Sequence, residues 1–241
     1  MDILETMASA VESVNVLKQQ SVQIENMRKI LPALLEKGLD NVNLSMFDES
    51  TRLVLLNSFG EEYVRKGRLQ EAMKAFILAG NHARISDIGI DYERVGLFEN
   101  AIECYRLAGN HEKLSKIGSK CLEDGKLGAA IQAFRAIDDV PRLASVGDEC
   151  LRKEKYDYAI EVFSSLNNKQ KLVEVGDKAL RERQLGYASK AFELAGNSEK
   201  LSALGDVCLR ENLIATALQC YTLAGNHMMA QFVEQNFGRQ K

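Results

Sequence analysis

Histidine and cysteine are the residue types in this chain that could bind a metal or act as nucleophiles. The histidines each follow a Gly-Asn pair, at His82, His111 and His227, so they share one position of a repeated pattern. A metal site needs three or four converging ligands, and the sequence has no His pair or Cys/His cluster at metal spacing. We therefore expect these histidines to lie at exposed helix starts, and we expect no metal or other cofactor.

The cysteines also follow a repeated pattern. Cys121, Cys150 and Cys208 share one position, while Cys104 and Cys220 each directly precede an aromatic residue. Free cysteine commonly packs as a small buried hydrophobe, so we expect structural roles for all five. An odd number of cysteines without a Cys-x2-Cys pair is typical of the reducing cytoplasm.

No sequence motif provides nucleophilic, metal-assisted or nucleotide chemistry. The chain lacks a Gly-rich phosphate loop, G-x-S-x-G and H-E-x-x-H. Its acidic residues follow the repeat instead of forming pairs. These observations predict that the protein is not an enzyme.

Composition narrows the function classes further. The 241 residues include 31 Lys and Arg against 34 Asp and Glu, a net charge of −3, whereas general polyanion binders are usually basic. The hydrophobic share of 46% is enough for a packed core. No apolar run approaches the ~20 residues of a membrane helix, and no basic segment followed by an apolar block marks a secretory signal. We expect a cytoplasmic protein that does not insert into membranes.

A period of 29 residues organises most of the chain and is marked by four sets of equivalent positions. The glycines are Gly60, Gly89, Gly118, Gly147, Gly176 and Gly205, and the alanines are Ala72, Ala101, Ala130, Ala159, Ala188 and Ala217. The aromatics are Phe76, Tyr105, Phe134, Phe163, Phe192 and Tyr221, and the aliphatics are Leu56, Ile85, Leu114, Leu143, Leu172 and Leu201. The six copies are 53–81, 82–110, 111–139, 140–168, 169–197 and 198–226.

Each copy has the apolar spacing of two helices. Asn110, just before the third copy, is placed to cap that copy's first helix, whose apolar face has the i, i+3, i+4, i+7 spacing. Gly125 is placed to end that helix, and a second apolar helical face follows from Leu127 to Ile137. The fold class is therefore all-α: a right-handed α-α superhelix of six helix-turn-helix repeats with helical caps.

The repeated glycines lie inside predicted helices, where glycine costs about 1 kcal/mol relative to alanine. We attribute them to close approach of the second helix, whose repeated alanine is also small. Gly147→Leu should therefore destabilise the array strongly.

The pattern resembles the tetratricopeptide repeat, W-x2-L-G-x2-Y followed by A-x3-F. The second copy matches it from Ile85 to Tyr92 and from Ala101 to Tyr105. The period is 29 instead of 34 residues, the leading Trp is aliphatic, and the closing Pro is absent. A looser likeness is to the helical arms of vesicle-coat and ciliary-transport proteins.

The resemblance implies a concave face, lined by the first helix of each repeat, that binds a peptide, a helix or a partner subunit. Beside the apolar face of the first helices, an acid, a leucine and an arginine recur. We call these positions the shoulder of each first helix. The candidate binding residues are Asp148, Leu151, Arg152, Asp177, Leu180, Arg181, Asp206, Leu209 and Arg210. The alternative for these residues is structural, since an acid four residues before a base forms a helix salt bridge and the leucines could pack on the next repeat.

Tetratricopeptide proteins that hold C-terminal carboxylates use Lys and Asn in the first helices, and this chain has no Lys at the matching positions. Those positions are Asn57, Ser86, Ser115, Ala144, Val173 and Ser202. A carboxylate clamp is therefore not expected.

The ends depart from the repeat. Residues 1–50 have the pattern of an N-terminal helical cap and linker, with Asp48 or Ser50 capping the first repeat helix, and residues 227–241 that of a C-terminal capping helix with Gln, Arg and Lys facing water. Residues 1–37 could instead mediate self-association or docking.

The sequence thus predicts a non-catalytic scaffold or adaptor for a protein or peptide. The alternatives are a self-assembling or coat-like, trafficking-type component and an RNA-binding helical repeat protein.

Overall fold

The structure is a computed structural model that describes residues 30–238. Residues 30–37 are helical, and no β-strand occurs among the described residues. The chain forms two compact units that divide between His111 and Glu112. Unit 1 contains a 3-10 helix, η1 (Leu39–Asn41), and the helices α2 (Glu49–Arg65), α3 (Leu69–Leu78), α4 (His82–Arg94) and α5 (Phe98–Leu107).

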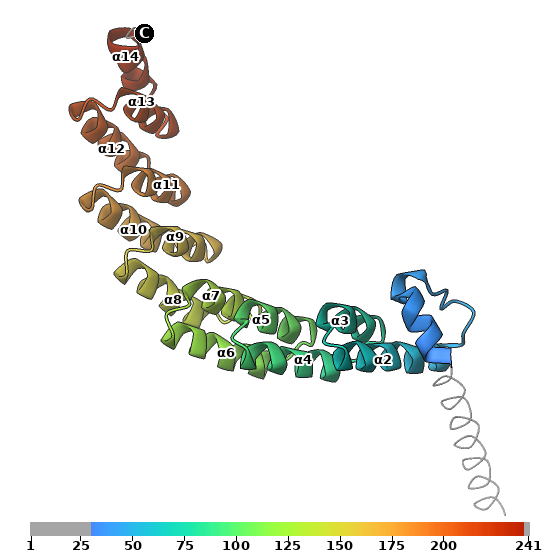
Figure 1. The fold of residues 1–241 in the computed structure, drawn as a ribbon. Coiled ribbons are helices and arrows are strands. Elements are labelled where there is room, and N and C mark those ends of the chain that lie inside the picture. The colour runs from blue at the N-terminus through green and yellow to red at the C-terminus, as the bar shows by residue number, and fades with distance from the viewer. Residues whose placement is uncertain (1–29, 239–241) are drawn as a thin grey trace, which may run out of the picture. The chain divides into compact units, whose positions relative to one another are not determined.

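Unit 2 continues the same alternation of longer first helices and shorter second helices (Figure 1). The first helices are α6 (His111–Glu123), α8 (Val140–Arg152), α10 (Lys169–Arg181), α12 (Ser198–Arg210) and α14 (His227–Phe237). The second helices are α7 (Leu127–Arg135), α9 (Tyr156–Ser165), α11 (Leu185–Ala195) and α13 (Ile214–Leu223). In Figure 1, α8, α10 and α12 form one row and α9, α11 and α13 form another. The predicted all-α, helical-repeat fold is confirmed.

The junctions between repeats start the first helices by side-chain capping. Asn168 and Asn197 each accept a hydrogen bond from the backbone N–H three residues later, at 3.1 and 3.0 Å. Asp139 and Asn226 cap α8 and α14 in the same way. Asp48, one of the two predicted caps, starts α2 by accepting from the N–H of Thr51 at 2.9 Å.

The turn between the two helices of each repeat needs one residue in the left-handed region. Gly125 takes this conformation with φ of 72°, as its predicted role at the end of a helix requires. The same turn recurs every 29 residues even where glycine is absent, at Glu154, Arg183 and Asn212. It also occurs one period before the first copy, at Gly38 with φ of 78°, so the backbone period extends into the N-terminal segment.

The repeated glycines lie against aromatic rings, which confirms the predicted close approach and specifies the contacting group. A Cβ added to Gly147 would lie 2.8 Å from Cζ of Phe163 and 2.9 Å from Cγ1 of Val162. Each of the other glycines in the series likewise faces the ring of the aromatic residue sixteen positions later. These rings are all buried, so glycine admits the ring of the second helix to the core.

The two ends of the described chain differ from simple polar caps. Before α2, Leu35 and Leu39 are buried, and Asp40 forms an ion pair with Lys74. On α14, glutamines face water as predicted, but Met228 is 75% and Phe232 46% exposed. Predictions for residues 1–29 and 239–241 lie outside the described residues. Within residues 30–238, no helix has both the length and the hydropathy needed to cross a membrane.

Candidate protein-binding surface

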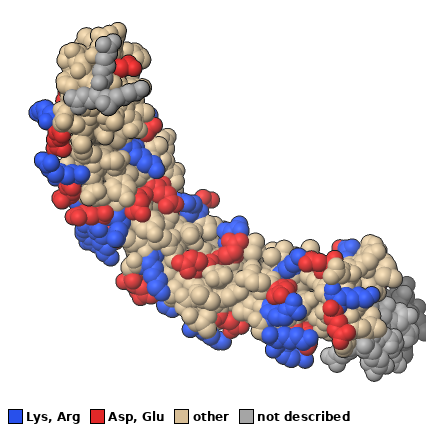
Figure 2. Space-filling model, turned by 45° about the horizontal axis from the view of Figure 1, so that its top comes forward, with Lys and Arg blue, Asp and Glu red and all other residues tan. Residues whose placement is uncertain are grey.

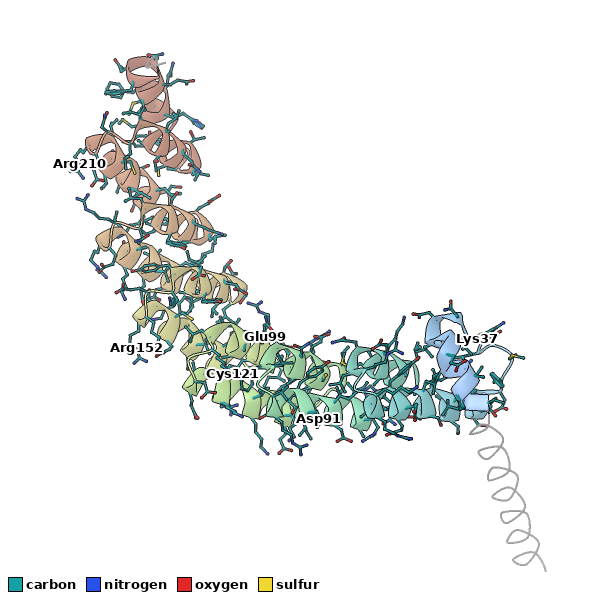
Figure 3. All side chains as sticks on the ribbon, in the orientation of Figure 1. Lys37, Asp91, Glu99, Cys121, Arg152 and Arg210 are labelled. Atoms are coloured by element: carbon teal, nitrogen blue, oxygen red, sulfur yellow. The ribbon has the colours of Figure 1, made fainter. Side chains whose placement is uncertain are left out.

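The predicted shoulder residues lie on α8, α10 and α12, all in unit 2. The arginines are exposed, and Figure 3 labels two of them, Arg152 and Arg210. The three leucines, Leu151, Leu180 and Leu209, are half-buried. Each shoulder therefore presents a partly accessible apolar side chain beside a cation.

The shoulder aspartates do not form the expected ion pairs with the arginine four residues later in their own helix. Asp148 lies 3.1 Å from Nζ of Lys171, and Asp177 lies 2.7 Å from Nζ of Lys200. Both lysines belong to the first helix of the following repeat. Arg152 pairs instead with Glu149, three residues earlier. These two aspartates therefore hold successive repeats together, which favours a structural role for Asp148 and Asp177.

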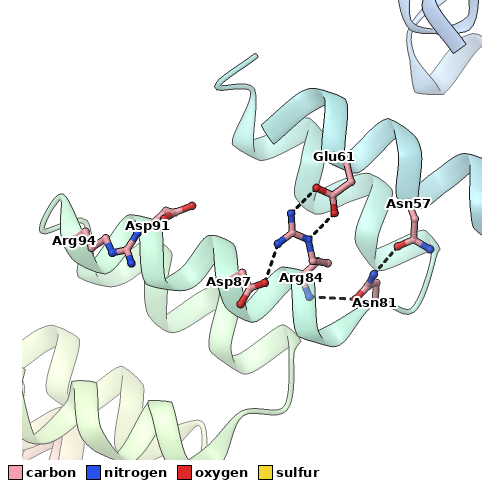
Figure 4. Close-up of polar contacts among 7 residues, drawn as sticks. All are labelled: Asn57, Glu61, Asn81, Arg84, Asp87, Asp91 and Arg94. Atoms are coloured by element: carbon pink, nitrogen blue, oxygen red, sulfur yellow. Dashed lines mark hydrogen bonds and ion pairs between the residues drawn. The ribbon is translucent and has the colours of Figure 1, made fainter. Parts of the chain in front are cut away.

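Unit 1 has the same kind of ion pair between successive repeats (Figure 4). Nε of Arg84 on α4 donates to Glu61 on α2 at 2.6 Å, and Nη1 donates to Asp87 at 2.9 Å. These two carboxylates, Glu61 foremost, raise the pKa of Arg84 above its ordinary value. The spacing of 23 residues from acid to base is identical in both units. We call these contacts the inter-repeat ladder: Glu61–Arg84, Asp148–Lys171 and Asp177–Lys200.

The carboxylate-clamp positions are also used between repeats. The side-chain amide of Asn81 donates to Asn57 at 2.5 Å, and that of Asn110 donates to Ser86 at 3.0 Å. The amide of Asn226 makes the equivalent contact at the end of unit 2, 3.5 Å from Ser202. Asn57, Ser86 and Ser202 therefore bind the junction asparagine of the next repeat, a role that the sequence pattern alone did not indicate. Ser115, at the same position, instead accepts a hydrogen bond from the side chain of Arg142.

The backbone under the first shoulder is held from the next repeat. Nζ of Lys178 on α10 donates to the carbonyl oxygens of Leu151 at 2.8 Å and of Arg152 at 3.3 Å. These carbonyls are at the end of α8, where no further turn of the helix supplies donors, and that of Leu151 also accepts from the N–H of Glu154 at 3.3 Å. A cation there also complements the negative end of the helix dipole. The C-terminal end of α8 is therefore held in place by a contact from the next repeat.

In the last repeat, the shoulder lacks the ladder contact. The position that carries Lys171 and Lys200 in earlier repeats is occupied by Met229. Asp206 instead accepts a hydrogen bond from the hydroxyl of Tyr221 at 2.7 Å. Burial and this carboxylate raise the pKa of Tyr221, so the tyrosine stays a neutral donor.

A groove in unit 1 was not predicted as a specific site. It has a volume of about 690 Å³ and lies between residues 30–37 and α2. A smaller depression of about 480 Å³ lies at the N-terminal ends of α10 and α12. The groove has apolar and charged walls: Leu31, Pro32, Leu35, Glu36, Ser58, Glu61, Glu62, Arg65 and Lys66. Its shape depends on how two helices pack, which a repeat pattern does not specify.

The histidines and cysteines occupy the positions expected from their repeat register. His82, His111 and His227 are the first residues of α4, α6 and α14 and are exposed. Nδ1 of His82 lies 3.2 Å from the carbonyl oxygen of Leu107. No group of three potential metal ligands converges within residues 30–238.

All five cysteines are buried. Burial raises the pKa of Cys104, Cys150 and Cys208 to about 11. These thiols are therefore protonated near neutral pH, whereas a reactive cysteine needs thiolate character.

Comparison with known proteins identifies no family. No protein-family model matches the sequence, and no curated protein matches it. Among solved structures, the chain is similar to a circular tandem repeat protein with novel repeat topology and enhanced subunit contact surfaces. That similarity has 14% identity and a TM-score of 0.15, and it spans 94% of this chain and 53% of the other.

Proposed function

We propose that the protein is a non-catalytic scaffold or adaptor of the cytoplasm. It would bind a peptide, a helix or a partner subunit along the first-helix row of unit 2. The observation that carries the proposal is the regular row of half-buried leucines and exposed arginines on α8 and α10. Stacked repeats display such a row as one extended surface.

The proposed ligand has an apolar face bordered by acidic groups. Leu151 and Leu180 would contact the apolar face, while Arg152 and Arg181 would contact carboxylates. Among residues 30–238, no acidic side chain forms an ion pair with Arg181, and the side chain of Arg152 is 75% exposed. Neither arginine therefore requires a buried contact to be broken before it binds a partner.

We further propose that the repeats are a short form of the tetratricopeptide repeat. The support is the repeated glycine, alanine and aromatic spacing together with the glycine-to-ring contact seen in each copy. Acidic and basic side chains are interspersed on the face shown in Figure 2, an arrangement that favours a protein ligand over the alternative of an RNA ligand.

Charge reversal tests the proposed surface without altering its core. The intact protein and the double variant Arg152→Glu/Arg181→Glu would be used to capture partners from the source cell. Arg94→Glu is a matched control because Arg94 ends a first helix in unit 1, is 75% exposed and pairs with the acid three residues earlier, Asp91. We expect the double variant to lose a partner that the wild type and the control retain.

A groove variant separates this proposal from docking at the N-terminal segment. Pro32 and Glu36 are exposed groove residues, so Pro32→Asp/Glu36→Lys changes that surface alone. Loss of the partner with this variant, but not with the arginine variant, would contradict binding on α8 and α10.

A further inference from the structure

Helix α14 is the last helix of the chain and occupies the place of a first helix in the repeat. Its exposed face differs from those of the other first helices in unit 2. The second and sixth positions of α10 carry Gln170 and Glu174, and those of α12 carry Glu199 and Ala203. On α14 the same positions are Met228 and Phe232. Met228 is 75% exposed and Phe232 46% exposed. The ring of Phe232 also meets Phe237 edge to face, at 6.2 Å between centroids, and Phe237 is 40% exposed.

Helix α14 is also depleted of charge. Apart from His227 at its first position, its only ionisable residue is Glu234, while α12 carries Glu199, Lys200, Asp206 and Arg210. Exposed patches of Met and aromatic residues with few charges are typical of the core of a protein interface. Glu234 is six residues from Met228, which at 100° per residue places it about 120° around the helix.

The neighbouring face of α12 bears one charge of each sign. Glu199, Ala203 and Arg210 have the spacing i, i+4, i+11, so they share one helix face. Neither Glu199 nor Arg210 forms an ion pair with another residue of the described range 30–238, and both are exposed. The acid lies at the start of α12 and the base at its end. The Asn226–Ser202 contact ties the start of α14 to α12, so the two faces adjoin.

We propose that this combined face of α12 and α14 is the interface of a homodimer in which the helices of the two copies run antiparallel. A two-fold axis perpendicular to the helices brings Met228 and Phe232 against the same apolar residues of the second copy. It also places each Glu199 opposite Arg210 of the second copy. The surface is therefore complementary to itself, as a two-fold interface requires. This interface is separate from the leucines and arginines of α8 and α10 that we propose to bind a ligand.

Sedimentation velocity of the full chain over a wide concentration range tests the proposal. We expect the wild type to approach twice its monomer mass of 26.9 kDa and Met228→Gln/Phe232→Gln to remain a monomer with an unchanged circular dichroism spectrum. Met46→Gln is the control, since Met46 is 76% exposed in unit 1, and it should dimerise like the wild type. A monomeric wild type, or a dimeric double variant, would overturn the proposal.

Charge exchange tests the antiparallel arrangement. Glu199→Lys and Arg210→Glu should each weaken dimerisation several-fold, because each places like charges opposite one another. The double variant Glu199→Lys/Arg210→Glu restores opposite charges at both contacts and should recover the wild-type dissociation constant. Failure of the double variant to recover, with both single variants impaired, would exclude the antiparallel arrangement.

Discussion

At the scale of the residue, the glycine in the first helix determines whether an aromatic ring can enter the core. The sequence predicted close approach at these glycines because they recur inside helices at a fixed distance from an alanine and an aromatic residue. The alanine was thought to mark the contact, but the ring itself fills the space next to glycine. A sequence pattern indicates that a small residue is needed, whereas only packing shows which atoms it accommodates.

Two glycine-to-alanine substitutions in unit 2 should have opposite effects. Gly147→Ala places a Cβ against Phe163 and Val162, and we expect it to destabilise the protein by about 1–3 kcal/mol, the usual cost of overpacking a core. In Gly186→Ala the new Cβ would have no described heavy atom within 4 Å apart from its chain neighbours and the backbone of its own helix, so the change should stabilise α11 by up to about 1 kcal/mol. Denaturant unfolding of both variants measures the difference.

Equal midpoints for the two variants would contradict the role assigned to the glycine. A lower midpoint for Gly186→Ala than for Gly147→Ala would contradict it more strongly, since the open position would then be the more demanding one.

At the scale of the element, the sequence located the helices and their starts, because caps and apolar spacing act within a few residues. The turns inside the repeats were only partly predictable. Gly125 was recognised as a helix end, but the equivalent Arg183 has φ of 58° and carries no signal in its residue type. There the repeat geometry imposes a conformation that an L-residue tolerates at a cost.

Replacing that arginine should relieve the cost. We expect Arg183→Gly to stabilise unit 2 by up to about 1 kcal/mol, because glycine adopts positive φ without strain. This variant loses the ion pair between Arg183 and Glu211. The side chain of Arg183 is 79% exposed, and ion pairs at such exposed positions contribute little to stability. The reciprocal change Gly125→Arg at the same turn should lower the unfolding midpoint. A decrease for both variants would show that the arginine contacts outweigh the backbone strain.

The start of α2 should depend on pH. Hydrogen bonds from Ser50 and then from Thr51 lower the pKa of Asp48 from 3.8 to about 2. A carboxyl group with a lowered pKa in the folded state stabilises the fold above its unfolded pKa, and this contribution is lost as the pH falls through the folded value. We therefore expect protection of the Thr51 amide against hydrogen exchange to decrease between pH 3.8 and about 2.

The amide of Met229 provides the control, because it is held by the non-titrating cap Asn226. Its protection should change less over the same range. Loss of protection at Met229 before Thr51 would indicate general acid unfolding instead of titration of the cap.

At the scale of the whole molecule, the 29-residue period was sufficient to predict an all-helical repeat fold. It was not sufficient to predict which charges pair. Asp148 and Asp177 were expected to pair within their own helices or to bind a ligand, yet both contact lysines of the next repeat. That choice depends on the distance between neighbouring helices. The division at His111 likewise falls inside an unbroken repeat pattern, so no change in the sequence marks it.

Site-specific photo-cross-linking in the source cell shows directly whether partners bind along α8 and α10. A photoreactive amino acid would replace Arg152, Arg181 or the control Arg94, one position in each experiment. We expect the positions of Arg152 and Arg181 to yield cross-links to the same partner and the position of Arg94 to yield none. Equal cross-linking at Arg94, or a partner that cross-links only from a groove residue such as Glu36, would contradict binding along α8 and α10.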